Sequence, residues 1–238
     1  MATVSILQLA KDAADELSLA RPSTLVDNDS DNTAQKLLRH MTRTVRQLAT
    51  RYDLQELRAE HTFTTVALAD QATASPLLSD FLRFVPDTIF NRTKRFRITM
   101  LTPEEWQAHQ ASLTTRVYDA YIQRGNTLLI APTPAAGQTI AYEYITKFIC
   151  VNTAGNTYYT SFNADTDIAL LDDELIILGT VWRYQQAEGN DYAEPFREYE
   201  LRLGDLLKMN GGRRMIDMTG GSTDRIPTPP RTPETLVF

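Results

Sequence analysis

The stretch from Leu170 to Met209 constrains the fold most, because its pattern is that of two antiparallel helices joined by a short loop. Carboxylates at 172–174 occupy the expected start of the first helix, where unpaired backbone N–H groups and the helix dipole favour negative charge. Gly189 can end this helix in the left-handed conformation. Asp191 and Glu194 have the spacing of a capping box for the second helix. The stretch therefore predicts an antiparallel helix pair.

Both predicted helices carry an apolar face. In the first it is formed by Leu175, Leu178 and Trp182, with Ile177, Val181 and Tyr184 beside them. In the second, the apolar positions alternate between spacings of four and three, which is typical of helix packing, at Tyr192, Phe196, Tyr199, Leu203 and Leu206. The pattern is a structural signal, and by itself it indicates no chemistry.

Two more helices are expected at the N-terminus. Residues 3–19 form an amphipathic pattern, residues 21–31 are turn formers, and a second helical pattern runs over 32–52. All charges of the second pattern are positive, and four of them form a stripe with spacings of three and four: Lys36, Arg39, Arg43 and Arg46, with Arg51 beyond.

This basic stripe has two interpretations. It can be a groove for nucleic acid or for an acidic partner. Alternatively, it is a solvated face or a match for carboxylates of the C-terminal helix pair. We favour the second interpretation, because the chain has a formal net charge of −6 and phosphate-binding proteins usually have a basic surplus.

From Glu60 the hydrophobic period changes to that of strands. Short runs rich in Thr, Val, Ile, Tyr and Phe, bounded by turn formers, predict antiparallel strands up to residue 168. Gly125-Asn126 and Gly155-Asn156 are expected hairpin turns. Thr102 followed by Pro103 predicts one short helix near 103–112.

A basic run between two of these strands has a less certain role. It contains Arg92, Lys94, Arg95 and Arg97, with Phe96 interleaved. Cations beside an aromatic ring suit single-stranded nucleic acid. The alternation equally suits a strand with one wet face. We favour that structural interpretation or a charged, partner-facing protein surface.

No motif of catalysis or of metal binding is present. His40, His61 and His109 are scattered, and there is no HExxH, CxxC, nucleophile elbow or phosphate loop. The single cysteine, Cys150, lies between apolar neighbours and is expected to be a buried hydrophobe. We therefore expect no catalysis, no metal and no cofactor. An enzyme, such as a hydrolase with a site that no motif reveals, is an alternative that paired carboxylates in the β region would favour.

The chain shows no apolar run of membrane-spanning length and no pattern of a signal peptide. A single cysteine excludes an intrachain disulfide and fits a reducing compartment. Residues 211–238 are rich in Gly and Pro and are expected to be an extended tail. They form either a docking peptide or an inert terminus.

These patterns predict an α+β fold. Residues 1–56 and 169–210 are expected to supply an α-helical bundle, residues 57–168 an inserted antiparallel β-sandwich or barrel-like module, and residues 211–238 an extended C-terminal tail.

Four stretches, taken in this order, resemble the head-to-tail adaptor proteins (tail tubular protein A-like) of short-tailed phages. They are TAQKLLRHMTRTVRQLATRYDLQEL with HTFTTVA, DTIFNRTKRFRITMLTPEEWQ, RGNTLLIAPTPAAGQTIAYEYITK and LLDDELIILGTVWRYQQAEGNDYAEPFREYELRL. They span most of residues 1–210, and the tail after Gly211 lies outside the resemblance.

The resemblance implies a virion protein without catalytic activity, assembled in the host cytoplasm and located at the head–tail junction. It implies a homo-oligomeric ring, typically a dodecamer, between the portal protein and the tail nozzle, with genomic DNA passing through the bore. A ring needs two different patches on each subunit. The basic stripe and an acidic set on the helix pair are candidates for these patches, the acidic set being Glu188, Asp191, Glu194 and Glu198.

The charged sets could also pair within one subunit. By analogy with connectors that insert a terminal segment into the portal, the tail is expected to dock there through Arg213, Arg214, Arg225 and Phe238. The alternative function is a nucleic-acid-binding module that uses the basic stripe of residues 32–52.

Overall fold

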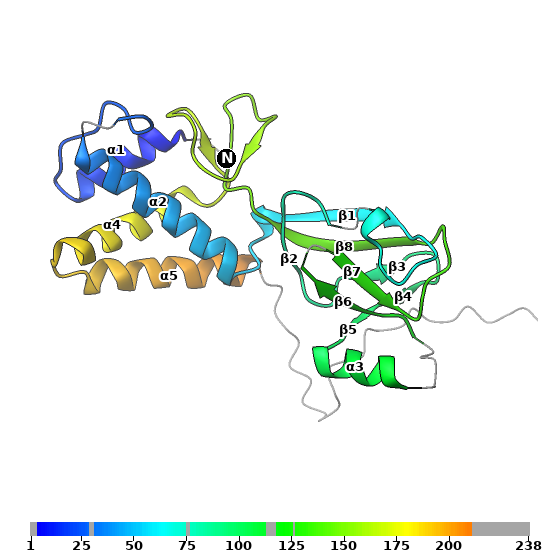
Figure 1. Cartoon of the computed structure of the whole chain (residues 1–238). Coiled ribbons are helices and arrows are strands. Elements are labelled where there is room, and N and C mark those ends of the chain that lie inside the picture. The colour runs from blue at the N-terminus through cyan, green and yellow to red at the C-terminus, as the bar shows by residue number, and fades with distance from the viewer. Residues whose placement is uncertain (1–3, 29–30, 75–76, 113–117, 126, 211–238) are drawn as a thin grey trace, which may run out of the picture.

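A computed structural model describes residues 4–28, 31–74, 77–112, 118–125 and 127–210. The protein is an α+β protein, as predicted, with a helical lobe and a β-rich lobe lying side by side (Figure 1). Two segments connect the lobes, one after α2 and one after β8. Within the described residues, no helix combines the length and apolar character that a bilayer span requires.

Four helices of the described chain make up the bundle: α1 (Ile6–Glu16), α2 (Asn32–Arg51), α4 (Asp173–Glu188) and α5 (Ala193–Asn210). α4 packs against each of the other three, which explains why its apolar side chains are spread around the helix. Its ends are as predicted. The Asp172 carboxylate accepts from the N–H of Leu175, and Gly189 ends the helix at φ +78°.

α2 and α4 cross at very short range. A Cβ atom at Gly179 of α4 would lie only 2.4 Å from Cγ2 of Thr44 on α2. The two helices enclose a single core that also includes residues of α1 and α5, among them Leu9 and Leu203. Glycine at position 179 is therefore a steric requirement of this crossing.

The apolar seam predicted for α5 is only partly correct. Tyr199 and Leu203 are buried, whereas Tyr192 and Phe196 are 39% and 38% exposed. These two rings lie beside Trp182, which is itself half-buried. The start of α5 thus extends past the covered part of the bundle, because α5 packs chiefly on α4.

The β lobe contains two sheets. Its elements are η1 (Gln55–Leu57), β1 (Arg58–Thr64), η2 (Ala72–Ala74), β2 (Phe81–Phe84), β3 (Phe90–Asn91), β4 (Phe96–Arg97), β5 (Thr99–Met100), α3 (Pro103–Ala111), β6 (Ala120–Arg124), β7 (Thr127–Ala131) and β8 (Thr139–Thr146). One sheet has the order β1-β8-β3-β4, with β2 also paired to β8, and the other has the order β5-β6-β7. One apolar core contains residues of both sheets, including Tyr142 and Ile130.

Two local predictions for this lobe are confirmed. Thr102 caps α3 through a capping box with Glu105, and Pro103 begins the helix. Arg124 pairs with Thr127 in the β6–β7 hairpin, with Gly125 at φ +57°. The other half of that predicted turn, Asn126, lies outside the described residues.

The sequence predicted only antiparallel strand pairs, and this prediction is wrong for one pair. β5 is parallel to β6, with Thr99 opposite Ala120. A parallel pair requires a crossover connection, and α3 lies in the chain between these two strands. The short helix predicted from Thr102 and Pro103 therefore forms part of the crossover that lets β6 run parallel to β5.

A third sheet belongs to the helical lobe. It consists of β9 (Cys150–Val151), β10 (Tyr158–Tyr159) and β11 (Ile168–Ala169), in the order β10-β9-β11. Cys150 lies in the core of the bundle, and burial raises the pKa of its thiol to about 12. The thiol is thus unreactive, as the sequence predicted. The β9–β10 hairpin turns with Gly155 at φ +71°, as expected.

The strand expected over the basic run is only partly correct, because residues 92–95 form a turn and strand structure begins at Phe96. β3 and β4 form a short antiparallel hairpin instead, with Phe90 opposite Arg97. Asn91 organises the turn, because its side-chain oxygen accepts the N–H of Lys94 at 2.9 Å and its carbonyl accepts the N–H of Arg95. Asn and Asp side chains commonly build turns in this way, and here that local chemistry prevails over the alternating pattern.

The helix crossing yields the first prediction. Gly179→Ala should lower the free energy of unfolding by about 1–3 kcal/mol, because the new methyl group overlaps Thr44. Gly204→Ala on α5 is the matched control, since nothing lies within 4 Å of its Cβ position. That control should raise stability by up to about 1 kcal/mol. Denaturant unfolding measures both, and equal effects would contradict the tight crossing.

Candidate functional site

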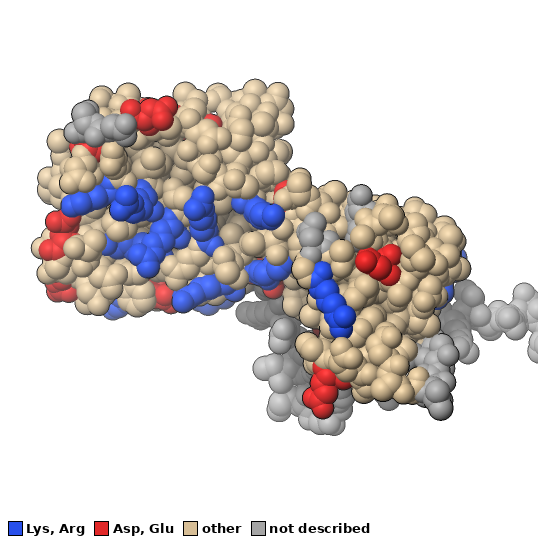
Figure 2. Space-filling model, viewed as in Figure 1, with Lys and Arg blue, Asp and Glu red and all other residues tan. Residues whose placement is uncertain are grey.

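The outer side of α2 carries a dense group of exposed cations, which we call the basic face: Arg39, Arg43, Arg46 and Arg51. The inner side of the same helix buries Leu37, Met41, Val45 and Leu48 in the core, so helical spacing turns the arginines outward. Figure 2 shows the resulting band of Lys and Arg side chains over the helical lobe.

The basic face is hollowed. Its four arginines line an open depression of about 690 Å³ together with Thr42, Gln47 and Thr50. These three side chains carry hydroxyl or amide groups, which can accept or donate hydrogen bonds. The lining is therefore suited to a polar, negatively charged partner.

Most of these cations lack an acidic partner in the described chain. Lys36, the fourth member of the predicted stripe, pairs with Glu188 of α4 at 2.6 Å. Arg46 donates to the carbonyl oxygen of Thr160 at 3.2 Å. Among the described residues, no ion pair is formed by Arg39, Arg43 or Arg51. The stripe and the C-terminal helix pair are thus joined within the subunit at Lys36 and Glu188.

A buried guanidinium adds to the positive charge beneath this face. Arg183 of α4 is 4% exposed and donates to Thr44 Oγ1 at 2.8 Å, to the Gly179 carbonyl at 2.7 Å and to Gln47 Oε1 at 2.5 Å. Its guanidinium carbon lies 4.3 Å from the centre of the Trp182 ring. All three acceptors are neutral, so these bonds leave its charge uncompensated.

The pKa values of two groups, Arg183 and His40, are lowered in this positively charged region. Burial lowers the pKa of Arg183, although a guanidinium remains charged at any physiological pH. Burial also lowers the pKa of His40, and the positive charges of Arg183, Arg43 and Arg39 lower it further. His40 is therefore neutral at pH 7, and the charge of the region comes from arginine and lysine.

The structure also gathers carboxylates from three helices, which the sequence analysis did not bring together. This acidic cluster consists of Asp12 and Glu16 of α1, Glu174 of α4 and Glu198 of α5. Partial desolvation raises the pKa of Glu16, and the charges of Glu198, Asp12 and Glu174 raise it further. Helical spacing places Asp12 and Glu16 on one face of α1, but no local pattern predicts their interaction with Glu198.

The four carboxylates of the predicted acidic set (Glu188, Asp191, Glu194 and Glu198) do not act together, because each has different partners. Glu188 pairs with Lys36, and Glu194 pairs with Arg197 at 2.8 Å on its own helix. The Asp191 carboxylate accepts the N–H of Ala193 at 3.0 Å, as at a helix start. Only Glu198 joins the acidic cluster.

The basic residues of the β3–β4 region mostly bind carboxylates of the same chain. Arg92 pairs with Glu60, Arg97 pairs with Asp87 at 3.2 Å, and Lys94 pairs at 2.9 Å with Asp119, which is 2% exposed. Arg95 is exposed, at φ +62°. Three of the four candidate residues thus form ion pairs within the lobe, and the partner-facing role of this loop stays a prediction.

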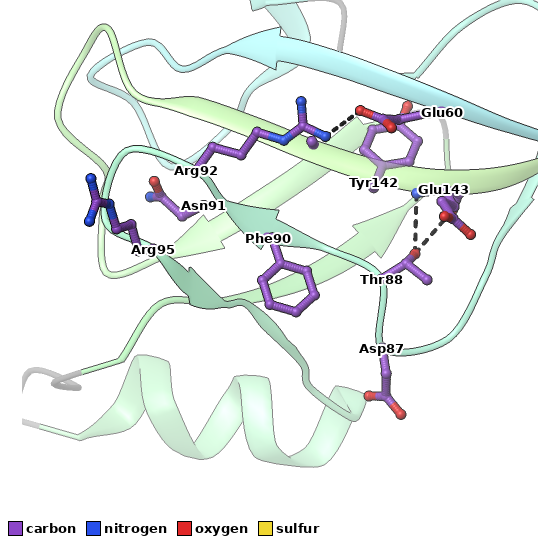
Figure 3. A pocket seen from close by; sticks show the side chains of 10 residues that line it. Glu60, Asp87, Thr88, Phe90, Asn91, Arg92, Arg95, Tyr142 and Glu143 are labelled. Atoms are coloured by element: carbon purple, nitrogen blue, oxygen red, sulfur yellow. Dashed lines mark hydrogen bonds and ion pairs between the residues drawn. The ribbon is translucent and has the colours of Figure 1, made fainter. Parts of the chain in front are cut away.

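A second hollow, of about 520 Å³, lies on this lobe, and three carboxylates line it: Asp87, which pairs with Arg97, and Glu60 and Glu143 (Figure 3). Glu60 and Glu143 are cross-strand neighbours of β1 and β8. Glu60 pairs with Arg92, and Glu143 pairs with Arg58 at 3.5 Å. Each carboxylate is thus matched by its own arginine, which is the arrangement of a stable strand pair rather than of an acid–base pair.

The described residues contain no group of three or more His, Cys, Asp or Glu side chains arranged to hold a metal ion. The predicted tail residues Arg213, Arg214, Arg225 and Phe238 lie outside the described part of the chain. The basic face and the acidic cluster are therefore the surfaces on which a functional argument can be built.

Comparison with known proteins gives one family. A family model described as SU10 adaptor protein matches residues 4–225, which include every described helix and strand. A search of curated proteins finds no match to the chain.

The acidic cluster yields a prediction on pH dependence. The folded-state pKa of Glu16 is raised, so its contribution to stability is present below the unfolded-state pKa and is lost as pH rises through the folded pKa. Glu16→Gln should therefore raise the free energy of unfolding at pH 7 by roughly a few tenths of a kcal/mol, allowing for solvent screening. The gain should vanish near pH 3.

Asp15→Asn is the control for this prediction. Asp15 neighbours Glu16 on α1, but its pKa is lowered by a hydrogen bond from Arg21. Neutralising Asp15 should bring no gain at pH 7. Urea unfolding of both variants at several pH values measures the difference, and a gain at Asp15 alone would contradict the assigned charge distribution.

Proposed function

The chain belongs to the SU10 adaptor protein family, and we propose that it forms a closed ring between the portal and the tail nozzle of a short-tailed phage. The observation that carries this proposal is the family match over residues 4–225. A structural phage adaptor needs interaction surfaces rather than a catalytic centre, and the charged surfaces described above are of that kind.

A ring of identical subunits places geometric demands on each copy. Each subunit must present two different surfaces, one for each neighbour, and the rotation between neighbours must close. The helical lobe carries surfaces of opposite sign, on α2 and on α1, α4 and α5. The β lobe lies beside it and is available for the portal or the nozzle (Figure 1). We propose a dodecamer, the number that the sequence resemblance implies.

The charge of the chain fits a conduit for DNA. The formal net charge is −6, so the subunit as a whole does not attract phosphates. Tight contacts with the DNA backbone would hold the genome in place and would make its passage salt-dependent. In our proposal the genome passes through the bore without sequence-specific binding.

A second candidate function follows from the arginines that lack acidic partners. A helix bearing Arg39, Arg43 and Arg51 in a hollow can bind the backbone of a nucleic acid. Binding of this kind would weaken steeply with salt, because each neutralised phosphate releases counterions. Titration of DNA at two salt concentrations distinguishes this function from a passive conduit.

Light scattering with and without purified portal protein tests the ring. We expect a monomer that becomes a closed ring when the portal is added, because the portal supplies the template. A protein that ignores the portal at all ratios would contradict the proposed location.

Removal of residues 211–238 tests the proposed docking of the tail, through Arg213, Arg214, Arg225 and Phe238, into the portal. The truncated chain should keep its circular dichroism spectrum, because the three described cores lie before residue 211. It should no longer join portal rings. Particle completion by the truncated chain would remove the tail from the proposal.

A further inference from the structure

The basic face and the acidic cluster are each incomplete in the isolated subunit. Arg39, Arg43 and Arg51 form no ion pair with any described residue, and the uncompensated guanidinium of Arg183 lies beneath them. The Gln47 side chain accepts from Arg183 and also lines the hollow, so the buried cation lies next to this depression. A concentration of cations in a hollow attracts a partner that brings carboxylates or phosphates.

The acidic cluster has a surplus of negative charge, because two of its carboxylates lack a basic partner among the described residues. Glu174 pairs with Arg202 at 3.1 Å, and Asp12 accepts from Gln8 at 2.7 Å. Glu16 and Glu198 are exposed and form no ion pair with any residue that the structure describes. These two carboxylates, one on α1 and one on α5, repel each other and are free to receive cations from outside the subunit.

The two surfaces belong to different elements of one bundle. The basic face is carried by α2, and the acidic cluster is carried by α1, α5 and the first turn of α4. Because each surface lies on the same packed core, their separation and orientation are constant from copy to copy. A chain with complementary surfaces of this kind can join head to tail with copies of itself.

We propose that the basic face of one copy binds the acidic cluster of the next copy, with Arg39 and Arg43 facing Glu16 and Glu198. This inference rests on the proposed ring and names the contact through which it closes. A second copy fits better than DNA because the same chain supplies the missing carboxylates, whereas its net charge of −6 opposes a polyanion. Contacts between exposed charges should also make the ring sensitive to salt.

Reciprocal charge reversal tests this contact. Arg39→Glu with Arg43→Glu makes the basic face acidic, and Glu16→Lys with Glu198→Lys makes the acidic cluster basic. Each double variant alone should lose ring formation on the portal, because like charges then meet at every junction. An equimolar mixture of the two should recover a ring of alternating copies, since one type of junction is reversed on both sides and the other is unchanged.

Light scattering with portal protein measures all four samples, including the wild-type chain. Arg124→Glu with Lys147→Glu is the matched control for the Arg39/Arg43 variant, because it lowers the net charge by the same amount. Arg124 in β6 and Lys147 after β8 are exposed and lie outside both proposed surfaces. This control should form rings like the wild type. Recovery in the mixture also shows that both reversed variants are folded.

Three results would overturn the inference in distinguishable ways. Rings formed by either reversed variant alone, or a mixture that stays unassembled, would refute this contact while leaving the adaptor ring in place. Rings that persist while the Arg39/Arg43 variant loses DNA binding would assign the basic face to nucleic acid. A wild-type chain that forms no ring on the portal would refute the proposed function and this contact with it.

Discussion

The close crossing of α2 and α4 is the contact on which the rest of the helical lobe depends. Gly179 lets the helices approach until Thr44 occupies the space of a side chain, and Arg183 then reaches across to Thr44 and Gln47. A guanidinium this deeply buried is tolerated because its donors reach acceptors and one face lies on the Trp182 ring. The crossing also determines which side of α2 faces solvent, and so it positions the basic face.

Charge is used differently in the two lobes. In the β lobe, most arginines and lysines near β3 and β4 are matched by carboxylates of the same chain, as in the pair of Lys94 with the buried Asp119. In the helical lobe, surplus cations and surplus carboxylates lie on separate helices. Charges that are paired within a subunit are already compensated, whereas separated and uncompensated charges favour association with another molecule. This contrast is why the interface is proposed on the helical lobe.

Family membership and the geometry of the bundle answer different questions about this protein. The match over residues 4–225 makes the chain a phage adaptor, but it says nothing about which helix meets which neighbour. The geometry of the bundle supplies candidates for that contact because it places opposite charges on different helices around one core. The hollow at Glu60 and Glu143 bears on the alternative of an enzyme. Its carboxylates are matched by arginines, so it provides no support for a hydrolase.

Local sequence determined much of this protein. Caps at Asp172 and Thr102, glycine turns at Gly125 and Gly155, and the inward face of α2 all follow from interactions within a few residues. Sequence also indicated the exposed arginines of α2, because helical spacing alone separates them from the core.

Only the tertiary structure decided the interactions between distant segments. Examples are the pairing of Lys36 with Glu188, the parallel alignment of β5 with β6, and the repulsion between Glu16 and Glu198. It also decided that the first turns of α5 extend beyond the core and leave Phe196 exposed. The physical reason is that a periodic pattern specifies which side of an element is apolar, whereas the packing of the whole chain selects the element that covers it.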